Sequence, residues 1–155
     1  MILILWIGFS PDASATALSV GQKAPALVVT DINGHKFDLA ALHGKTVVIT
    51  LCASWCPPCL AEIPTLNDFY SKYHAKNVEM LALSLDRAHD RDAMKKIAAT
   101  MRYPAAMSSE ASDNGFDETG SLPVTYVIDP NGNINFAFSE KPVTEKELIT
   151  ALSGH

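Results

Sequence analysis

Residues 51–64 read LCASWCPPCLAEIP. The two cysteines of the motif in this stretch, Cys56 and Cys59, are separated by two prolines. An apolar run over residues 46–52 leads into the motif and is typical of a central strand that is covered on both faces. An amphipathic pattern of helical spacing follows the motif. A strand that turns into a helix at Cys56 places the two thiols one helical turn apart, which is the layout for making and breaking a disulfide.

The helix start sets the chemistry expected of the two thiols. There Cys56 faces unpaired backbone N–H groups and the positive end of the helix dipole, which lower a thiol pKa from about 8.5 to roughly 3.5–7.5. Cys56 is therefore the predicted nucleophile. Cys59, one turn further in, is expected to be less exposed and to resolve the mixed disulfide that Cys56 forms. Pro57 and Pro58 suit a first helical turn, where a proline sacrifices no intrahelical hydrogen bond.

A Cys-x-x-Cys pair can also be half of a zinc site. The chain has no second pair, and Cys52 and the five histidines show no ligand spacing. Covalent attachment of haem would need His directly after the second cysteine, where this chain has Leu60. We therefore expect no metal, and no cofactor besides the redox-active disulfide of Cys56 and Cys59.

The motif WCPPC at residues 55–59, followed by Glu62-Ile63-Pro64, resembles the thioredoxin-fold reductases of the TlpA/ResA type. The resemblance covers about residues 20–153. It implies an α/β thioredoxin-like fold, in which helices flank a central mixed β-sheet, with an N-terminal β-hairpin and a central helix–strand insertion. It also implies an extracytoplasmic location and thiol:disulfide exchange, often in cytochrome c maturation.

The same resemblance assigns Glu62 a role. This residue falls where the family carries a buried acid beside the resolving cysteine, and such an acid would have a raised pKa and could shuttle the proton that exchange requires. The plain alternative is a surface carboxylate that only favours the helix dipole. Two departures from the family pattern are visible. Cys52 stands where an aromatic residue is more frequent, and it is expected to be a packed, inert thiol rather than a regulatory one. Leu60 replaces a basic residue, which makes the rim of the site less positive.

Leu122-Pro123 resembles the cis-proline loop of the family. The sequence alone favours a trans bond, because only about 5% of X–Pro bonds are cis in folded proteins. In the family this loop lies against the dithiol and offers backbone groups to an extended substrate. The residues expected to bind the substrate are Trp55, Pro57, Pro58, Leu122 and Pro123.

The N-terminus suggests export. Residues 1–9 are apolar, and Ala15-Thr16-Ala17 fits the small-x-small rule for signal cleavage. Residues 1–17 are thus predicted to be a signal peptide and residues 18–155 a thioredoxin-like domain. No Lys or Arg precedes the apolar stretch, so an uncleaved membrane anchor is the alternative to a released, periplasmic protein.

Composition and charge limit the possible partners. With 48% apolar residues the chain can bury the core of a single domain, and neither its net charge of −5 nor any basic stripe suggests nucleic acid. The expected partners are proteins that bear disulfides or dithiols. Because the bacterial periplasm is kept oxidising, a reductase there would need a membrane-spanning thiol reductant as electron donor. We expect a monomer.

Turn signals predict two hairpins. The first joins residues 26–30 and 35–39 through an Asn-Gly turn and is expected at an edge before the core. The second joins antiparallel strands at 124–129 and 133–139 through an Asp-Pro-Asn-Gly turn.

Between the hairpins, a strand at 78–85 and an extended piece at 105–108 flank a helix. This βαβ alternation predicts parallel strands. The inward face of the helix is expected to carry Met94, Ile97, Ala98 and Met101. Residues 109–120 are rich in Ser, Asp and Gly and are predicted to form a surface loop with room for one helical turn.

A capping box, Thr144-x-x-Glu147, predicts a closing helix. Its inward residues are expected to be Leu148, Ile149 and Leu152.

The residues thus predict a thiol:disulfide oxidoreductase, and the resemblance favours a reductase of specific exported proteins. The direction depends on a potential that in related folds runs from about −270 to −120 mV and that no motif fixes. A peroxiredoxin-like peroxidase is an alternative, although neither Cys52 nor Cys56 lies in a Pro-x-x-x-Thr-x-x-Cys pattern. A non-catalytic chaperone that holds copper or haem through the thiols is another.

Overall fold

The computed structural model describes residues 18–116 and 121–154. The α-helices are α1 (Pro57–Tyr73), α2 (Arg91–Ala98) and α3 (Glu145–Leu152). The strands are β1 (Leu27–Thr30), β2 (Lys36–Asp38), β3 (Thr46–Cys52), β4 (Val78–Ser84), β5 (Ala105–Met107), β6 (Asp113–Asn114), β7 (Val124–Ile128) and β8 (Ile134–Ser139). Four 3₁₀ turns connect them, η1 (Leu39–Leu42), η2 (His74–Lys76), η3 (Ala88–Asp90) and η4 (Ser108–Glu110). The predicted signal peptide, residues 1–17, lies outside the described residues, and none of the described helices is long and apolar enough to cross a membrane.

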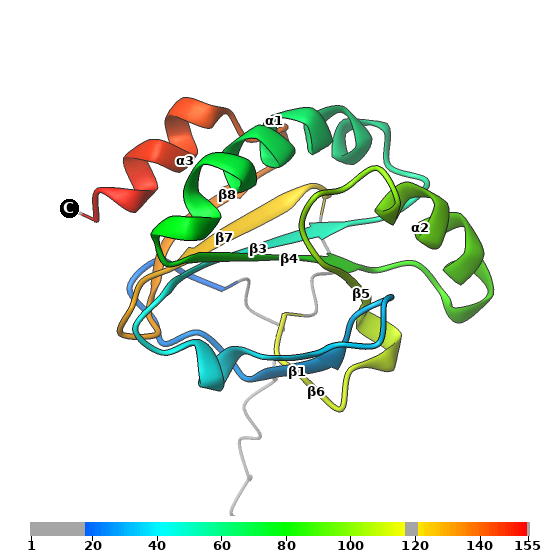
Figure 1. Ribbon diagram of the computed structural model, residues 1–155, viewed down its shortest axis with the longest axis horizontal. Helices are drawn as coiled ribbons and strands as arrows, with labels where there is room; N and C mark the ends of the chain where they lie inside the picture. Colours follow the sequence, from blue (N-terminus) through cyan, green and yellow to red (C-terminus); the bar gives the residue numbers. More distant parts are fainter. Residues whose placement is uncertain (1–17, 117–120, 155) are drawn as a thin grey trace, which may run out of the picture.

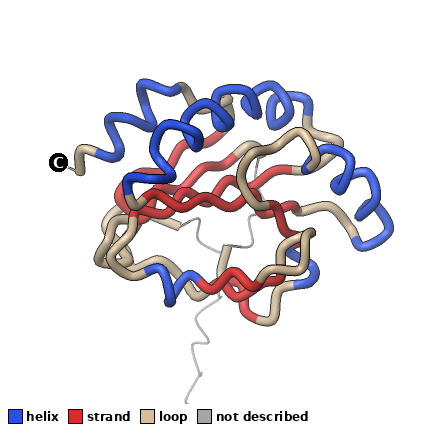
Figure 2. Tube along the Cα trace, in the orientation of Figure 1, coloured by secondary structure: helices blue, strands red, loops and turns tan. Residues whose placement is uncertain are grey.

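The central sheet has five strands in the order β5-β4-β3-β7-β8. β3 pairs in parallel with β4, and β4 with β5, whereas β7 is antiparallel to both β3 and β8. The parallel pairs require crossover helices, and right-handed crossovers running in one direction place α1 and α2 on the same face. Figures 1 and 2 show α1, α2 and α3 together on that face. The predicted mixed sheet and the central helix–strand insertion, α2 with β5, are confirmed.

The two faces of β3 bury alternate residues, as strand geometry requires. One set packs under the helices and the other against a small sheet of order β2-β1-β6 that covers the opposite face (Figure 1). The core under the helices includes Val48, Leu66, Phe69, Met80, Met94 and Leu148. The second core includes Leu27, Ile49, Leu81, Phe116 and Tyr126. β3 is therefore buried on both sides, as its nearly continuous apolar sequence predicts.

The N-terminal hairpin forms as predicted, with β1 antiparallel to β2. It belongs to a separate sheet that covers one face, and it touches the edge of the central sheet only just after β1, where Asp31 bridges to Ala106 of β5. The third strand of the separate sheet, β6, comes from the segment predicted to be a surface loop, and it pairs with β1. Phe116 just after β6 is fully buried against Tyr126. The polar pair of residues in β6 carries no strand periodicity, so only the long-range contact with β1 makes it a strand.

Two helices differ in detail from prediction. α2 ends at Ala98, so Met101 packs against the core from the following turn and not from the helix. In α3 the predicted inward position of Ile149 is wrong, because this side chain is 39% exposed. Leu148 and Ala151 are the buried residues. Positions three and four apart share a helix face, whereas a neighbour one position away is rotated by about 100°.

The predicted capping box of α3 is present. The Thr144 hydroxyl oxygen accepts from the Glu147 N–H at 3.2 Å, and the Glu147 carboxylate accepts from the Thr144 N–H at 2.8 Å. This second hydrogen bond is the main reason that the pKa of Glu147 is lowered to about 2. The carboxylate is therefore ionised at neutral pH and keeps its acceptor role.

We expect Thr144→Ala to lower the free energy of unfolding by about 1 kcal/mol, because the Glu147 N–H group loses its side-chain acceptor. Urea denaturation at pH 7 measures this. Thr150→Ala is the matched control, since its hydroxyl bonds only to the Lys146 carbonyl within the same helix. Equal losses in the two variants would show that the box adds nothing.

Candidate active site

Cys56 and Cys59 form a disulfide, with their Cα atoms 5.3 Å apart. Cys56 is the N-cap of α1, and the two prolines fill the first helical positions, as predicted. The Cys59 N–H donates to the Cys56 sulfur at 3.3 Å. The sulfur thus occupies the position that a serine or aspartate oxygen takes at other helix starts. Cys56 is 5% and Cys59 2% exposed, so Cys59 is the deeper of the two, as expected.

The predicted substrate-binding residues surround this end of α1. Trp55 is 64% exposed, and both prolines of the motif are exposed. The Leu122–Pro123 peptide bond is cis, as the family resemblance implies. Val124, the next residue, pairs with Leu51 in the central sheet, which brings the Leu122–Pro123 loop to the edge of the sheet where the motif begins.

Glu62 is a buried acid, so the alternative of a surface carboxylate is wrong. Its carboxylate accepts from the Thr50 hydroxyl and from the Val143 N–H, each at 3.0 Å. The Thr125 hydroxyl donates in turn to the Thr50 oxygen at 3.0 Å. Burial raises the pKa of Glu62, and the two hydrogen bonds offset only part of that effect. Glu62 follows Cys59 by three residues in α1, so the two side chains lie on the same side of the helix.

Asp86 is a second buried acid near the motif, and it was not among the predicted site residues. It accepts from the Ser54 N–H at 2.8 Å, from the Ser54 hydroxyl at 2.6 Å and from the Ser84 hydroxyl at 2.6 Å. These bonds tie the turn before Cys56 to the end of β4. An available signal was the place of Asp86 directly after a strand parallel to β3, because parallel strands bring their carboxyl ends to one edge.

Cys52 is a buried free thiol. Burial raises its pKa to about 12, with further contributions from the charges of Asp86 and Glu62. The thiol therefore stays protonated at neutral pH, which agrees with the expectation of an inert residue.

Tyr103 adds an unexpected polar group to the same core. Its hydroxyl is buried and has no hydrogen-bond partner among the described residues. Burial is the main reason that the pKa of Tyr103 lies above its usual value, and the charge of Glu62 adds to the effect. No sequence signal pointed to this group, because a tyrosine before an apolar strand is common.

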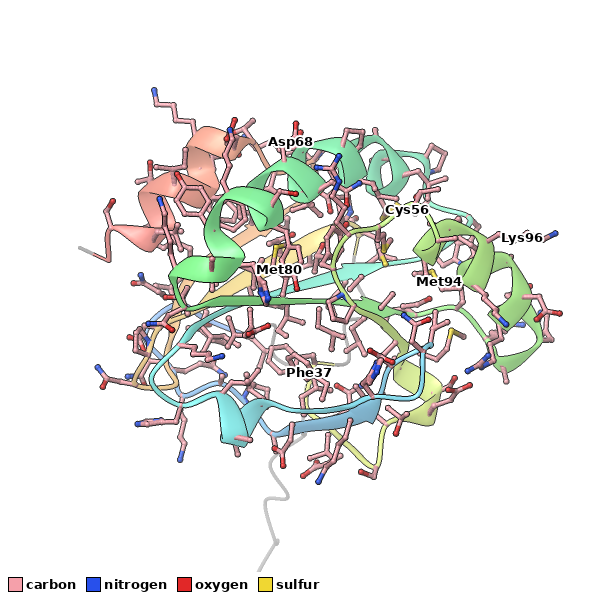
Figure 3. All side chains as sticks on the ribbon, in the orientation of Figure 1. Phe37, Cys56, Asp68, Met80, Met94 and Lys96 are labelled. Carbon is pink, nitrogen blue, oxygen red and sulfur yellow. A yellow bond between two sulfur atoms is a disulfide. The ribbon has the colours of Figure 1, made fainter. Side chains whose placement is uncertain are left out.

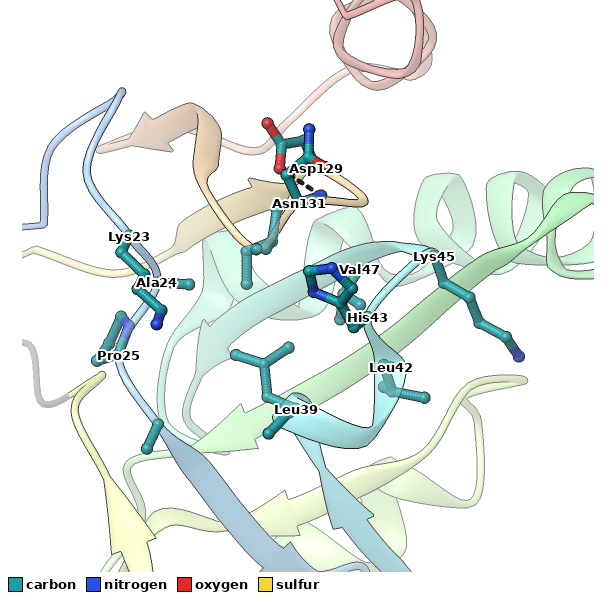
Figure 4. Close-up of a pocket in the computed structure, with 14 residues that line it drawn as sticks. Lys23, Ala24, Pro25, Leu39, Leu42, His43, Lys45, Val47, Asp129 and Asn131 are labelled. Atoms are coloured by element: carbon teal, nitrogen blue, oxygen red, sulfur yellow. Dashed lines mark hydrogen bonds between the residues drawn. The ribbon is translucent and has the colours of Figure 1, made fainter.

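A cavity of about 470 Å³ lies at the other end of β3. Leu39, Leu42 and Val47 line it, and Figure 4 shows Lys23 and His43 at its rim. Val47 is near the start of β3, whereas the motif follows the end of this strand. The cavity is therefore separate from the disulfide. Within residues 18–116 and 121–154, no group of three or more His, Cys, Asp or Glu side chains could hold a metal ion.

The sequence comparisons agree with this geometry. Residues 20–137 match the family model described as the AhpC/TSA family. The thiol-disulfide oxidoreductase ResA of Bacillus cereus is 34% identical over 132 residues, which are 84% of this chain and 74% of that protein. ResA of Geobacillus kaustophilus is 32% identical over 140 residues, which are 86% of this chain and 79% of the relative.

Solved structures show the same fold. A putative thiol:disulfide interchange protein DsbE from Chlorobium tepidum superposes with a TM-score of 0.74 at 25% identity, covering 88% of this chain and 97% of that one. A putative thiol-disulfide oxidoreductase from Bacteroides vulgatus gives a TM-score of 0.73 at 26% identity, covering 89% and 98% of the two chains. The paired cysteines at the start of α1 and these likenesses lead to one assignment. The chain belongs to the AhpC/TSA family and is a thiol:disulfide oxidoreductase of the ResA and DsbE type.

Proposed function

We propose that this oxidoreductase reduces the disulfides of specific exported proteins, with Cys56 as nucleophile, Cys59 as resolving thiol and Glu62 as proton acceptor. The observation that carries the proposal is the Cys56 sulfur at the N-cap of α1, where it accepts the Cys59 N–H. A thiolate at this position is stabilised by that donor and by the helix dipole. Cys56 is then ionised and nucleophilic at neutral pH.

The proposed reaction has two steps. The Cys56 thiolate attacks one sulfur of the substrate disulfide, so that a mixed disulfide forms and the other substrate sulfur leaves as a thiolate. Cys59 then loses its proton and attacks the Cys56 sulfur, which releases the second substrate thiolate. The substrate gains two electrons, and Cys56 and Cys59 become the disulfide seen in the structure.

Glu62 suits the second step. Its raised pKa makes the carboxylate a better proton acceptor than an exposed glutamate, and its place one turn after Cys59 puts it on the side of the resolving thiol. The Thr50 hydroxyl and the Val143 N–H hold the carboxylate in place. In this mechanism Glu62 takes the proton from Cys59 as that thiol attacks.

The substrate is proposed to lie across the exposed Trp55, Pro57 and Pro58 and the Leu122–Pro123 loop. The loop offers backbone groups beside the dithiol, so an extended substrate segment can pair with it. Residues 18–155 act as one domain and as a monomer in this proposal.

Export through the signal peptide at residues 1–17 would place the protein in an oxidising compartment. Each turnover would then leave the Cys56–Cys59 disulfide to be reduced again, and a membrane-spanning thiol reductant is the proposed donor. Cytochrome c maturation is the proposed process, on the resemblance to TlpA/ResA-type reductases. Disulfide exchange is favoured over peroxidase chemistry because neither Cys56 nor Cys52 lies in a Pro-x-x-x-Thr-x-x-Cys pattern, and because a protonated Cys52 is a poor nucleophile toward peroxide.

The redox midpoint of the Cys56/Cys59 couple tests the direction of the reaction. Full-length protein with Cys52→Ser is equilibrated in dithiol or glutathione buffers, and free thiols are counted with an alkylating mass tag. We expect a two-electron transition below about −230 mV, as befits a reductase. A midpoint near about −120 mV would make the protein an oxidant, and the absence of any two-thiol transition would refute exchange.

The order of attack predicts opposite behaviour of two cysteine variants. Cys59→Ser should accumulate a mixed disulfide with a protein substrate, since the resolving thiol is missing, whereas Cys56→Ser should form none. Non-reducing electrophoresis and mass spectrometry distinguish them. Trapping by Cys56→Ser in place of Cys59→Ser would reverse the two roles.

Glu62→Gln should lower the rate of mixed-disulfide release by about 10²-fold and remove an inflection from its pH profile, because no group is left to accept the proton. The amide can still accept from Val143 and donate to Thr50, so the fold is retained.

The dependence of stability on pH provides an independent readout. The pKa of Glu62 in the folded protein lies above its usual value of 4.5, which applies to the unfolded chain. At a pH between these two pKa values the native state therefore binds more protons than the unfolded state.

The stability of the wild type should therefore fall as the pH rises through that window, and that of Glu62→Gln should not. Urea denaturation across the window measures the difference. Glu110→Gln, which alters an exposed ion pair with Arg91, is the control and should follow the wild type in both assays. A pH-rate profile of Glu62→Gln that matches the wild type would exclude proton transfer by this residue.

A further inference from the structure

A groove runs between α1 and α2 and begins one helical turn after Cys56. Its cavity measures about 520 Å³, and its apolar lining comes from Leu60, Ile63 and Pro64 of α1 and Ile97 of α2. We call it the α1–α2 groove. It is distinct from the Leu122–Pro123 loop, because none of the residues of that loop line it.

The groove begins at Leu60, one helical turn after Cys56. Residues 60, 63, 64 and 67 of α1 line it, and they follow Cys56 at the three- and four-residue spacing of a single helix face. The Leu60 N–H also bonds to the Cys56 carbonyl at 3.2 Å. From Cys56 to Asn67 the helix rises about 16 Å at 1.5 Å per residue. An extended chain covers that length with about five residues.

The far end of the groove is held by Asn67. Its side-chain amide donates to the Thr100 carbonyl at 2.9 Å, and its oxygen accepts from the Arg102 N–H at 2.7 Å. The Arg102 guanidinium donates to the Ser71 hydroxyl at 3.0 Å as well. These bonds fix α1 to the segment after α2, so the groove is formed before any partner arrives.

Two exposed apolar side chains lie close to Cys56 in the sequence. Among the described residues, the large hydrophobic side chains that remain exposed are Val20, Trp55, Leu60 and Ile149. Trp55 and Leu60 flank Cys56 in the sequence, and Leu60, 37% exposed, lines the groove. Such a patch at a reactive group marks a surface that a partner covers.

The rim of the groove is positive in a chain whose net charge is −5. Arg102 pairs with Asp68 at 3.7 Å, whereas Lys96 is exposed and has no ion-pair partner in the part of the chain that the structure describes. Figure 3 shows Cys56 at the end of α1 that lies toward α2, with Lys96 extending outward from α2. The unpaired charge favours an acidic side chain on the partner.

We propose that the α1–α2 groove binds the extended segment next to the reactive cysteine of the protein substrate, and this rests on the proposed function. Leu60 lies about 6 Å along the helix from Cys56 and Ile63 about 10 Å, which correspond to about two and three residues of extended chain. The substrate therefore carries apolar side chains two and three residues from its cysteine, and because successive side chains of an extended chain point to opposite sides, one of them faces α1 and the other faces α2. An acidic residue follows them and faces Lys96.

Two peptide disulfides test this. One carries Leu at two and three residues from the cysteine and Asp at the fourth, and the other carries Ser, Ser and Lys there. Each peptide is made in two versions, one with these residues before the cysteine and one with them after it. Oxidised glutathione serves as a small disulfide substrate that lacks these residues. Ile97→Ser should lower kcat/KM for the Leu-Leu-Asp peptide about tenfold and leave glutathione reduction unchanged. Lys96→Glu should lower kcat/KM for the Asp peptide and raise it for the Lys peptide.

Matched controls lie on α3, away from the groove. Ile149→Ser makes the same substitution at an exposed isoleucine outside the groove, and Lys146→Glu makes the same charge change. If the groove variants affect the peptides no more than these controls do, the groove is not a substrate site.

A serine version of the Leu-Leu-Asp peptide cannot exchange, so its binding tests the groove separately. Fluorescence anisotropy should show a Kd weakened about tenfold by Ile97→Ser. If the wild type binds this peptide but reduces no disulfide, the proposed function fails and the groove stands. If the wild type reduces glutathione but binds no peptide, substrate binding in the groove is refuted and disulfide exchange is supported.

Discussion

The structure depends on one junction, the turn at which β3 becomes α1. β3 is buried on both faces, so its end is fixed in the molecule, and α1 must begin within a few residues of it. Cys56 completes the junction by capping the helix with its own sulfur. The sulfur that is proposed to attack the substrate is therefore also the atom that accepts an N–H group at the helix start. A residue that lacked this acceptor would leave a helix N–H without a partner.

Two buried carboxylates support the junction in different ways. Asp86 receives three hydrogen bonds, two of them from Ser54, and so it holds the turn that presents Trp55 and Cys56. Glu62 receives two and has a raised pKa. A carboxylate surrounded by donors is suited to positioning, whereas one whose burial outweighs its hydrogen bonds is suited to handling a proton. Cys52 lies within the field of both acids and is kept protonated by burial and by their charges.

Local patterns predicted most of the fold and the core of the site. The dithiol turn, the parallel strands, both hairpins and the capping box at Thr144 each depend on residues close in sequence. What the sequence did not predict depends on distant contacts. β6 is a strand only because β1 lies beside it, and Asp86 approaches Ser54 only because β3 and β4 are parallel neighbours. The cis bond at Pro123 could be anticipated only from the family resemblance, because local statistics favour trans.

The groove separates recognition from chemistry. The reactive part of the site comes from β3, α1 and the loop before β7, and in the proposed mechanism it contacts the substrate at its disulfide and backbone. The outer wall of the groove comes from α2 and the turn before β5, which form the insertion between β4 and the proline-bearing strand. Changes on the exposed face of α2 would alter the groove without disturbing the Cys56 cap or the Glu62 contacts. A fold with one exchange mechanism can therefore serve different partners through the residues on this one short helix.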